Sequence, residues 1–171
     1  YPGILPEEVE NNIVVPWFDM DAMQEAYDAC GGDVAGLIAQ PYDHGNFFDN
    51  VCATKEQWAK VRKFCDDHGM VLIIDDVRTG FRLDIAGSDH YYGFKADLIC
   101  FCKALANGYN MSAVCGGEHM KNTASSVVYT GSYWMSAEPF AACLACIPKM
   151  KKLDTPKMFR EMGTKLTDGF K

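Results

Sequence analysis

The sequence predicts an α/β protein with a layered, mainly parallel sheet flanked by helices. Three short apolar runs carry this prediction, at residues 34–39, 70–74 and 98–102. Continuous apolar runs of this length are typical of strands buried on both faces of a sheet. A helical pattern separates the first two runs, and a strand, a helix and a parallel strand form a right-handed crossover. We therefore expect the runs to be parallel neighbours in one sheet.

Composition narrows the class of protein. The chain has 171 residues, 49% hydrophobic and 23% charged, which is enough for the core of one domain. A net charge of −7 argues against nucleic acid as the main partner. No apolar stretch approaches membrane-spanning length and no signal peptide opens the chain, so we expect no membrane partner and a cytoplasmic location. The chain starts at Tyr1 and stops at Lys171 inside a helical pattern, so we expect a piece of a longer protein.

Eight cysteines would indicate disulfides in a small secreted chain, but most of these lie inside apolar runs. Reduced thiols are therefore expected. Cys143 and Cys146 form a CxxC pair, yet no second pair has zinc-ligand spacing and the chain has only four histidines. We expect small residues on a helix face here and no metal site.

The first part of the chain predicts a loop and then a helix. Tyr1–Trp17 contains three prolines and a glycine, which favours a loop. Asp21 is expected to cap the helix in a capping box with Gln24, and Gly31 and Gly32 should end it.

The run at 34–39 is closed by Gln40, and the turn-rich residues 41–50 follow it. Loops beyond the carboxyl end of a strand can line a pocket, so His44 could contact substrate. The alternative is a solvated loop histidine, which the ordinary frequency of such positions favours.

A second helix is predicted before the central run. Thr54 and Gln57 form a capping box, and Gly69 stops the helix. Its apolar stripe comprises Trp58, Val61, Phe64 and Cys65.

Chemistry is expected where the strands end. In open α/β sheets, ligands bind outside the carboxyl ends of the strands. Asp75 is the first residue after the central run, and Lys103 is the first after the run at 98–102. The chain thus offers a carboxylate and an amine at two strand ends.

Three segments resemble a known family. They are IIDDVRTGFR at 73–82, YYGFKADLICFCKALANGY at 91–109 and GSYWMSAEPFAACLA at 131–145. Together they closely resemble the class III, fold-type I aminotransferases that use pyridoxal phosphate, and within them the branch similar to glutamate-1-semialdehyde aminomutase. The resemblance runs from about Gly3 to the end, and its specific motifs lie between Ile73 and Pro139.

The resemblance implies roles for three of these residues. Asp75 would keep the ring nitrogen of pyridoxal phosphate protonated, and Val77 would pack against the ring. Lys103 would hold the cofactor as an internal Schiff base and then act as a base at the substrate's Cα. Apolar surroundings would lower the pKa of the Lys103 amine. The alternatives are a turn cap for Asp75, a core valine for Val77 and a surface lysine that opens a helix.

A further strand is expected over 112–116, followed by a polar and aromatic loop over 129–136. In the family a hydroxyl residue of this loop reaches the cofactor phosphate of the neighbouring subunit. Ser132 is the best match, while Thr130 and Ser136 remain alternatives, as does a simple helix cap.

Two residues depart from the family pattern. Gln40 stands where a glutamate usually precedes the proline, and Asp76 stands where a glutamate usually follows the aspartate. Their consequences cannot be derived from the sequence, and neither can a role for Arg82.

Two helices are expected to close the chain. One starts at Ala137, and Pro148 should kink or end it. Thr155 starts the other, whose stripe of Phe159, Met162 and Leu166 is expected to pack rather than bind a ligand.

The resemblance implies an aminotransferase or aminomutase that uses pyridoxal phosphate, a small-molecule amino donor and a carbonyl acceptor, and works as a homodimer. Residues 1–154 would be the central part of its large domain, and residues 155–171 would lead toward a missing small domain. A decarboxylase or racemase on the same fold is one alternative. The other is a non-catalytic assembly subunit or an inactive fragment.

Overall fold

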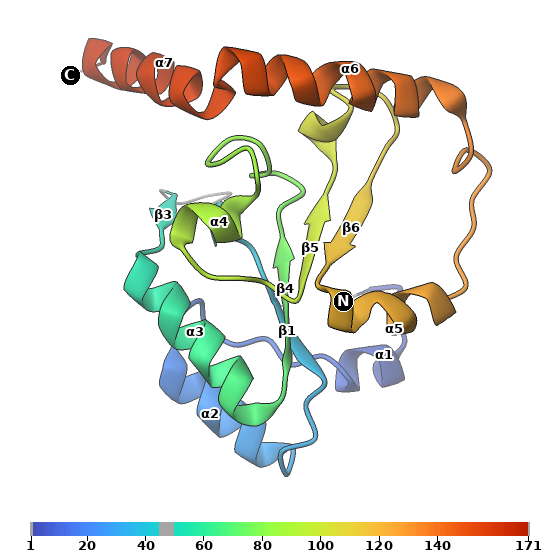
Figure 1. Ribbon diagram of the computed structural model, residues 1–171. Coiled ribbons are helices and arrows are strands. Elements are labelled where there is room, and N and C mark those ends of the chain that lie inside the picture. The colour runs from blue at the N-terminus through green and yellow to red at the C-terminus, as the bar shows by residue number, and fades with distance from the viewer. Residues whose placement is uncertain (1, 45–49, 171) are drawn as a thin grey trace.

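A four-stranded sheet forms the centre of the chain in the computed structural model, which describes residues 2–44 and 50–170 (Figure 1). The strand order is β1-β4-β5-β6. Neighbours β1, β4 and β5 run parallel, and β6 runs antiparallel to β5. The predicted mainly parallel sheet is therefore confirmed. Its strands are β1 (Gly36–Ala39), β4 (Val71–Asp75), β5 (Leu98–Phe101) and β6 (Ala113–Gly116).

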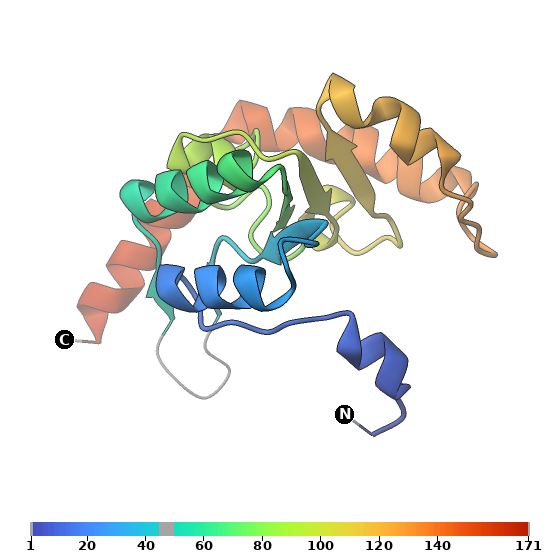
Figure 2. The same ribbon diagram turned by 90° about the horizontal axis from the view of Figure 1, so that it is seen from below.

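Helices flank this sheet, as expected (Figures 1 and 2). Two pack together on one side, α2 (Met20–Ala29) and α3 (Lys55–His68), where the Tyr27 and Phe64 rings lie 6.2 Å apart. Two others, α6 (Ala137–Leu153) and α7 (Thr155–Gly169), lie beyond the carboxyl end of β5. The short elements are α1 (Pro6–Glu10), β2 (Tyr42–Asp43), β3 (Val51–Cys52), α4 (Ser88–Tyr92), η1 (Lys103–Leu105), η2 (Glu118–Met120) and α5 (Lys121–Ser126).

The start of α3 confirms its predicted capping box. The Gln57 backbone N–H donates to Thr54 Oγ1 at 3.1 Å, and the Thr54 N–H donates to Gln57 Oε1 at 2.8 Å. Gly69 ends the helix in a left-handed conformation with φ of 66°. Both ends of α3 are therefore set by the residues that the pattern identified.

The N-terminal expectations need two corrections. Asp19, rather than Asp21, caps α2, since its Oδ1 accepts the Ala22 N–H at 3.0 Å and its backbone is extended as a cap requires. The predicted loop before Trp17 also contains the short helix α1, whose first residue is Pro6. Proline is well tolerated there because the first helical N–H has no helical partner. Expectations for Tyr1, residues 45–49 and Lys171 lie outside the described residues.

Two strand expectations also change. Asp75 is the last residue of β4 rather than the first beyond it, and it pairs in register with Cys100. The first strand begins at Gly36, and its Ile38 is 66% exposed. The exposure of Ile38 shows that the expected burial of this strand on both faces is wrong, and in the described part of the chain β1 is an edge strand that pairs only with β4.

The C-terminal helices differ from expectation in packing. Pro148 lies inside α6 and does not end it. The stripe Phe159, Met162 and Leu166 does not pack here, since these side chains are 44%, 60% and 65% exposed. None of the helices in the described part of the chain combines the length and apolar character needed to cross a membrane.

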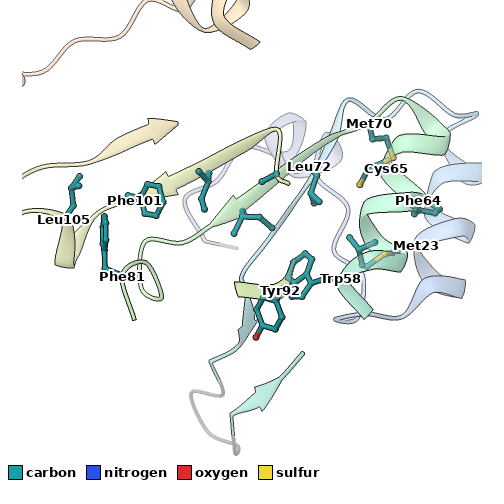
Figure 3. Close-up of a cluster of buried hydrophobic side chains, with 14 of the residues drawn as sticks. Met23, Trp58, Phe64, Cys65, Met70, Leu72, Phe81, Tyr92, Phe101 and Leu105 are labelled. Atoms are coloured by element: carbon teal, nitrogen blue, oxygen red, sulfur yellow. The ribbon is translucent and has the colours of Figure 1, made fainter. Parts of the chain in front are cut away.

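The core extends from α3 to the strand ends (Figure 3). Trp58 is fully buried, stacks on Phe94 at 4.9 Å and donates its Nε1–H to the Pro41 carbonyl at 3.1 Å. At the opposite end of the cluster, Phe81 lies 5.2 Å from Phe101. This second group supports the segment that leads into Lys103.

Candidate functional site

The site is built on the neighbouring carboxyl ends of β4 and β5. Asp75 ends β4 opposite Cys100, and Lys103 follows Cys100 by three residues. Adjacent strands in a sheet are about 4.8 Å apart, so the backbones at the carboxyl ends of β4 and β5 are neighbours. The structure therefore places the two residues that the sequence singled out, Asp75 and Lys103, at neighbouring strand ends.

Asp75 is half-buried and locally oriented. Its Oδ1 accepts the Val77 backbone N–H at 3.1 Å, which is the turn interaction that the sequence allowed. No hydrogen bond from any described residue engages Oδ2. The turn thus fixes the carboxyl group and leaves one oxygen for another cation or donor. Val77 is half-buried beside it.

Lys103 opens the 3₁₀ helix η1, and its own backbone is left-handed, with φ of 42°. This conformation is uncommon for a residue with a Cβ and costs on the order of 1–3 kcal/mol. Leu105 and Ala106 are buried and anchor the turn. Lys103 itself is exposed, so the described chain does not form the expected apolar surroundings of its amine.

His44 lies in the same region and is buried, with 8% of its surface exposed. The expected solvated histidine is therefore wrong. Its Nε2 lies 3.4 Å from Thr79 Oγ1, and its ring lies 4.2 Å from that of Tyr42. The sequence could not show the Thr79 contact, because it comes from a turn 35 residues away.

Burial lowers the pKa of His44, and the Arg78 charge lowers it further. The carboxylates of Asp75 and Asp43 oppose these effects, and Lys103 adds a small lowering. The lowered pKa favours the neutral imidazole of His44, and the charges of Asp75 and Lys103 act on it.

Asp76 has no exposed surface, and both of its carboxylate oxygens accept hydrogen bonds from Ser88. The Ser88 hydroxyl donates to Oδ1 at 2.5 Å and its backbone N–H donates to Oδ2 at 2.9 Å. Burial raises the pKa of Asp76 to about 6, although the Ser88 hydrogen bonds act in the opposite direction. No pattern in the sequence identified Ser88 as this partner.

Ser132 is exposed and lies in the loop between α5 and α6, which runs along the β6 side of the sheet in Figure 1. Thr130 is also exposed, and Ser136 occupies the N-cap position of α6 without a side-chain cap hydrogen bond. None of these three described hydroxyls forms a hydrogen bond with Asp75 or Lys103, and the expected contact is with a neighbouring subunit.

The other singled-out residues have local roles or none. The Arg82 guanidinium donates to the backbone carbonyls of Arg78 and Gly80, which fastens the turn after β4. Gln40 is exposed at the end of β1, and no contact explains its identity.

The cysteines are all free thiols. Within residues 2–44 and 50–170, no group of three or more His, Cys, Asp or Glu side chains could hold a metal ion. Cys143 is buried in α6, and the Cys146 thiol donates to the Ala104 carbonyl at 3.6 Å. The CxxC pair therefore packs α6 against the turn that follows Lys103.

Comparison with known proteins identifies the family. The profile described as "Aminotransferase class-III" matches residues 15–170. The chain belongs to the class III aminotransferases. This confirms the resemblance carried by the three sequence segments.

Class III relatives share most of this chain. It is 37% identical to the aminopentol aminotransferase of Sphingopyxis macrogoltabida over 142 residues, which cover 83% of the chain and 34% of the relative. It is 34% identical to a glutamate-1-semialdehyde 2,1-aminomutase of Sulfurihydrogenibium sp. (strain YO3AOP1), over 99% of the chain and 40% of the relative. The chain thus spans between about a third and two fifths of the length of these relatives.

Solved structures confirm the class III large-domain fold. The FumI protein of Sphingopyxis sp. MTA144, in its PLP internal aldimine form, matches with a TM-score of 0.81 and 35% identity over 87% of this chain and 36% of that protein. A transaminase with PLP bound matches with a TM-score of 0.76 and 25% identity over 86% of this chain and 36% of that protein.

Proposed function

We propose that this chain forms the cofactor-binding centre of a pyridoxal-phosphate-dependent aminotransferase or aminomutase. The observation that carries the proposal is the placement of Asp75 and Lys103 at neighbouring strand ends. Pyridoxal phosphate supplies an electron sink for the reacting amino compound when it is bound. The substrates would be a small amino donor and a carbonyl acceptor, as the names of the relatives indicate.

Asp75 fits the cofactor's protonated ring nitrogen. Its carboxyl group is half-buried and held by Val77, and Oδ2 has no described partner. A carboxylate and a cation about 4 Å apart, at an effective dielectric near 20, attract by roughly 4 kcal/mol. Val77 would lie against the ring as a stiff, β-branched side chain.

Lys103 fits the two remaining tasks. Its exposed amine is accessible for covalent attachment to the cofactor's aldehyde carbon. With the cofactor bound, the Lys103 amine would hold it covalently and, when free, would move a proton at the substrate's Cα. The buried Leu105 anchors the turn and so holds Lys103 at the carboxyl end of β5.

We further propose a homodimer, in which Ser132 of one protomer contacts the cofactor phosphate of its partner. Thr130 and Ser136 are the alternative hydroxyl donors. The surrounding loop supports an interface, because Tyr129, Tyr133 and Trp134 are 67%, 71% and 51% exposed. Exposed aromatic clusters are typical of surfaces that another chain covers.

The remaining parts of the proposal concern organisation. Residues 1–154 would be the central part of the large domain, with 155–171 leading to a smaller one. Eight free cysteines favour a reducing compartment, so we place the protein in the cytoplasm. No nucleic-acid or membrane partner is proposed.

An absorption spectrum with added pyridoxal phosphate tests the central claim. The parent chain should develop a visible band that borohydride fixes, and Lys103→Ala should not. Lys95→Ala is the matched control, because Lys95 is an exposed lysine of the same segment. Identical spectra for the parent and Lys103→Ala would support the non-catalytic assembly role instead.

Asp75→Asn tests the role of the carboxylate. The variant should still attach cofactor through Lys103, while turnover should fall by about three decades, since roughly 4 kcal/mol of stabilisation is removed. Product analysis by mass spectrometry separates amino transfer from decarboxylation or racemisation. A turnover rate that the substitution leaves unchanged would contradict the role of Asp75.

A further inference from the structure

A buried carboxylate stands directly between two of the proposed cofactor contacts. Asp76 follows Asp75 and precedes Val77, and it has no exposed surface. No Lys, Arg or His in the described part of the chain forms an ion pair with it. The charges that act on it most, on Asp89 and Asp75, have the same sign as its own.

This arrangement lowers the stability of the folded chain. A buried carboxylate without a cationic partner costs more than a neutral side chain of the same shape. Ser88 compensates in part through two hydrogen bonds, from its hydroxyl and its backbone N–H. Violations of packing rules that are supported in this way are typical of functional sites.

The hydrogen bonds between Asp76 and Ser88 close the loop that follows β4. We call the Asp76–Ser88 contact the clamp, and residues 77–87 the clamped loop. Gly80 lies so close to the preceding turn that a Cβ there would stand 2.7 Å from the Asp76 carbonyl oxygen and 2.8 Å from Phe101 Cδ1. Only a glycine fits this approach.

Phe81 of the clamped loop connects it to the second strand end. Its backbone is left-handed, with φ of 65°, an uncommon conformation for a bulky residue. Its ring packs on Phe101, two residues before Lys103. A movement of the clamped loop would therefore reach both Asp75 and the segment that carries Lys103.

We propose that Asp76 is a positioning residue, whose clamp to Ser88 holds the clamped loop so that Asp75 and Lys103 face the same space. The proposal rests on the proposed function of Asp75 and Lys103. Asp76 itself touches neither substrate nor cofactor. Cofactor binding should also depend on pH through Asp76, because a cation held at Asp75 favours the ionised form of Asp76.

Amide hydrogen exchange of the chain without cofactor tests the clamp. In Asp76→Ala the amides of residues 78–87 should exchange at least about tenfold faster than in the parent. Asp76→Asn should stay close to the parent, because its amide can donate to Ser88 Oγ while its oxygen accepts the Ser88 N–H. Asp84→Asn is the matched control, since Asp84 lies in the clamped loop and, among the described residues, its carboxylate accepts the local Ala86 N–H and pairs with a His90 nitrogen.

The pH dependence of cofactor attachment separates positioning from a merely structural role. The facing groups are Asp75, Asp89, the Ser88 hydroxyl and Tyr92. Cofactor attachment should strengthen between pH 5 and 7, and the gain should be up to about tenfold larger for the parent than for Asp76→Asn. Only the parent has a carboxyl group at position 76 that loses a proton in this range. The carboxyl carbon of Asp76 should titrate near pH 6 by NMR without cofactor, and Ser88→Ala should raise that midpoint.

Unchanged exchange of the clamped loop in Asp76→Ala would overturn the clamp. Parallel pH profiles for the parent and Asp76→Asn would overturn the pH dependence through Asp76. The exchange measurement uses the chain without cofactor and does not depend on the Lys103→Ala spectrum, so failure of the clamp and failure of the proposed cofactor site are distinguishable.

Discussion

At the scale of single residues, burial decides the charge of His44. Because burial and Arg78 lower its pKa, we expect its imidazole to titrate below the ordinary value of 6.5. NMR of the histidine ring protons will test this, with His44→Gln to assign the signal. A midpoint at or above the value of an exposed histidine would contradict the buried placement.

The sign of the His44 effect on stability follows from linkage. Its folded pKa is lower than its unfolded pKa, so the unfolded chain binds more protons between the two values. The free energy of unfolding therefore rises with pH across that window and falls on acidification. His44→Gln should remove this part of the pH dependence.

Asp76 changes the free energy of unfolding with pH in the opposite direction to His44. Its folded pKa of about 6 lies above the ordinary 3.8, so the folded chain binds more protons between these values. This contribution is most favourable below pH 4 and is lost as the pH rises through 6. Two pKa units correspond to about 3 kcal/mol, so Asp76→Asn should stabilise the chain at pH 7 by up to that amount. Urea unfolding at pH 4.5 and 7 will measure it, and equal effects at both would contradict the assignment.

The sequence alone predicted the placement of residues whose position depends on one strand. Asp75 and Lys103 could be predicted because each follows an apolar run. His44 and Ser88 could not, because their partners Thr79 and Asp76 come from other segments of the chain. Tertiary contacts of this kind leave no local pattern.

At the scale of elements, the helix caps offer a direct comparison. Thr54→Ala should destabilise the chain by about 1 kcal/mol through loss of the capping box of α3, and Asp19→Ala should do the same at α2. Asp21→Ala should have a smaller effect, because Asp21 is in the first turn and is not the cap. Denaturant midpoints will rank the three, and an equal cost for Asp21→Ala and Asp19→Ala would refute the observed cap.

The two caps also show where sequence reasoning fails. Thr54 is followed three residues later by a glutamine, and the structure uses that pair. Asp21 and Gln24 have the same spacing, yet α2 begins at Met20 because Asp19 already provides an extended backbone and a carboxylate. The pattern is necessary for a capping box but does not choose between neighbouring acids.

At the scale of the whole molecule, the sheet was predictable and its coverage was not. Apolar runs gave the parallel strands, because strands inside a parallel sheet must be apolar on both faces. The same logic assigned burial to Ile38 on β1 and to the stripe on α7, which are exposed here. Hydrophobic periodicity identifies a face that is to be covered, but not whether this chain or another supplies the cover.

The exposed stripe of α7 leads to a prediction for the whole chain. Phe159, Met162 and Leu166 lie on one helical face, and water contact with so much apolar surface is unfavourable. We expect the chain to self-associate at about 100 μM, with serine at all three positions shifting it toward monomer, by sedimentation velocity.

The control for this prediction replaces Lys157, Glu161 and Lys165 with serine, since these exposed residues lie on the same helix without apolar surface. The control should leave association unchanged, because surface charges contribute little to the free energy of such contacts. Equal sedimentation of both triple variants and the parent would show that the stripe does not drive association. In that case the aromatic loop at 129–134 would be the next exposed apolar surface to substitute, and a Trp134→Ser variant would test whether the two protomers meet there.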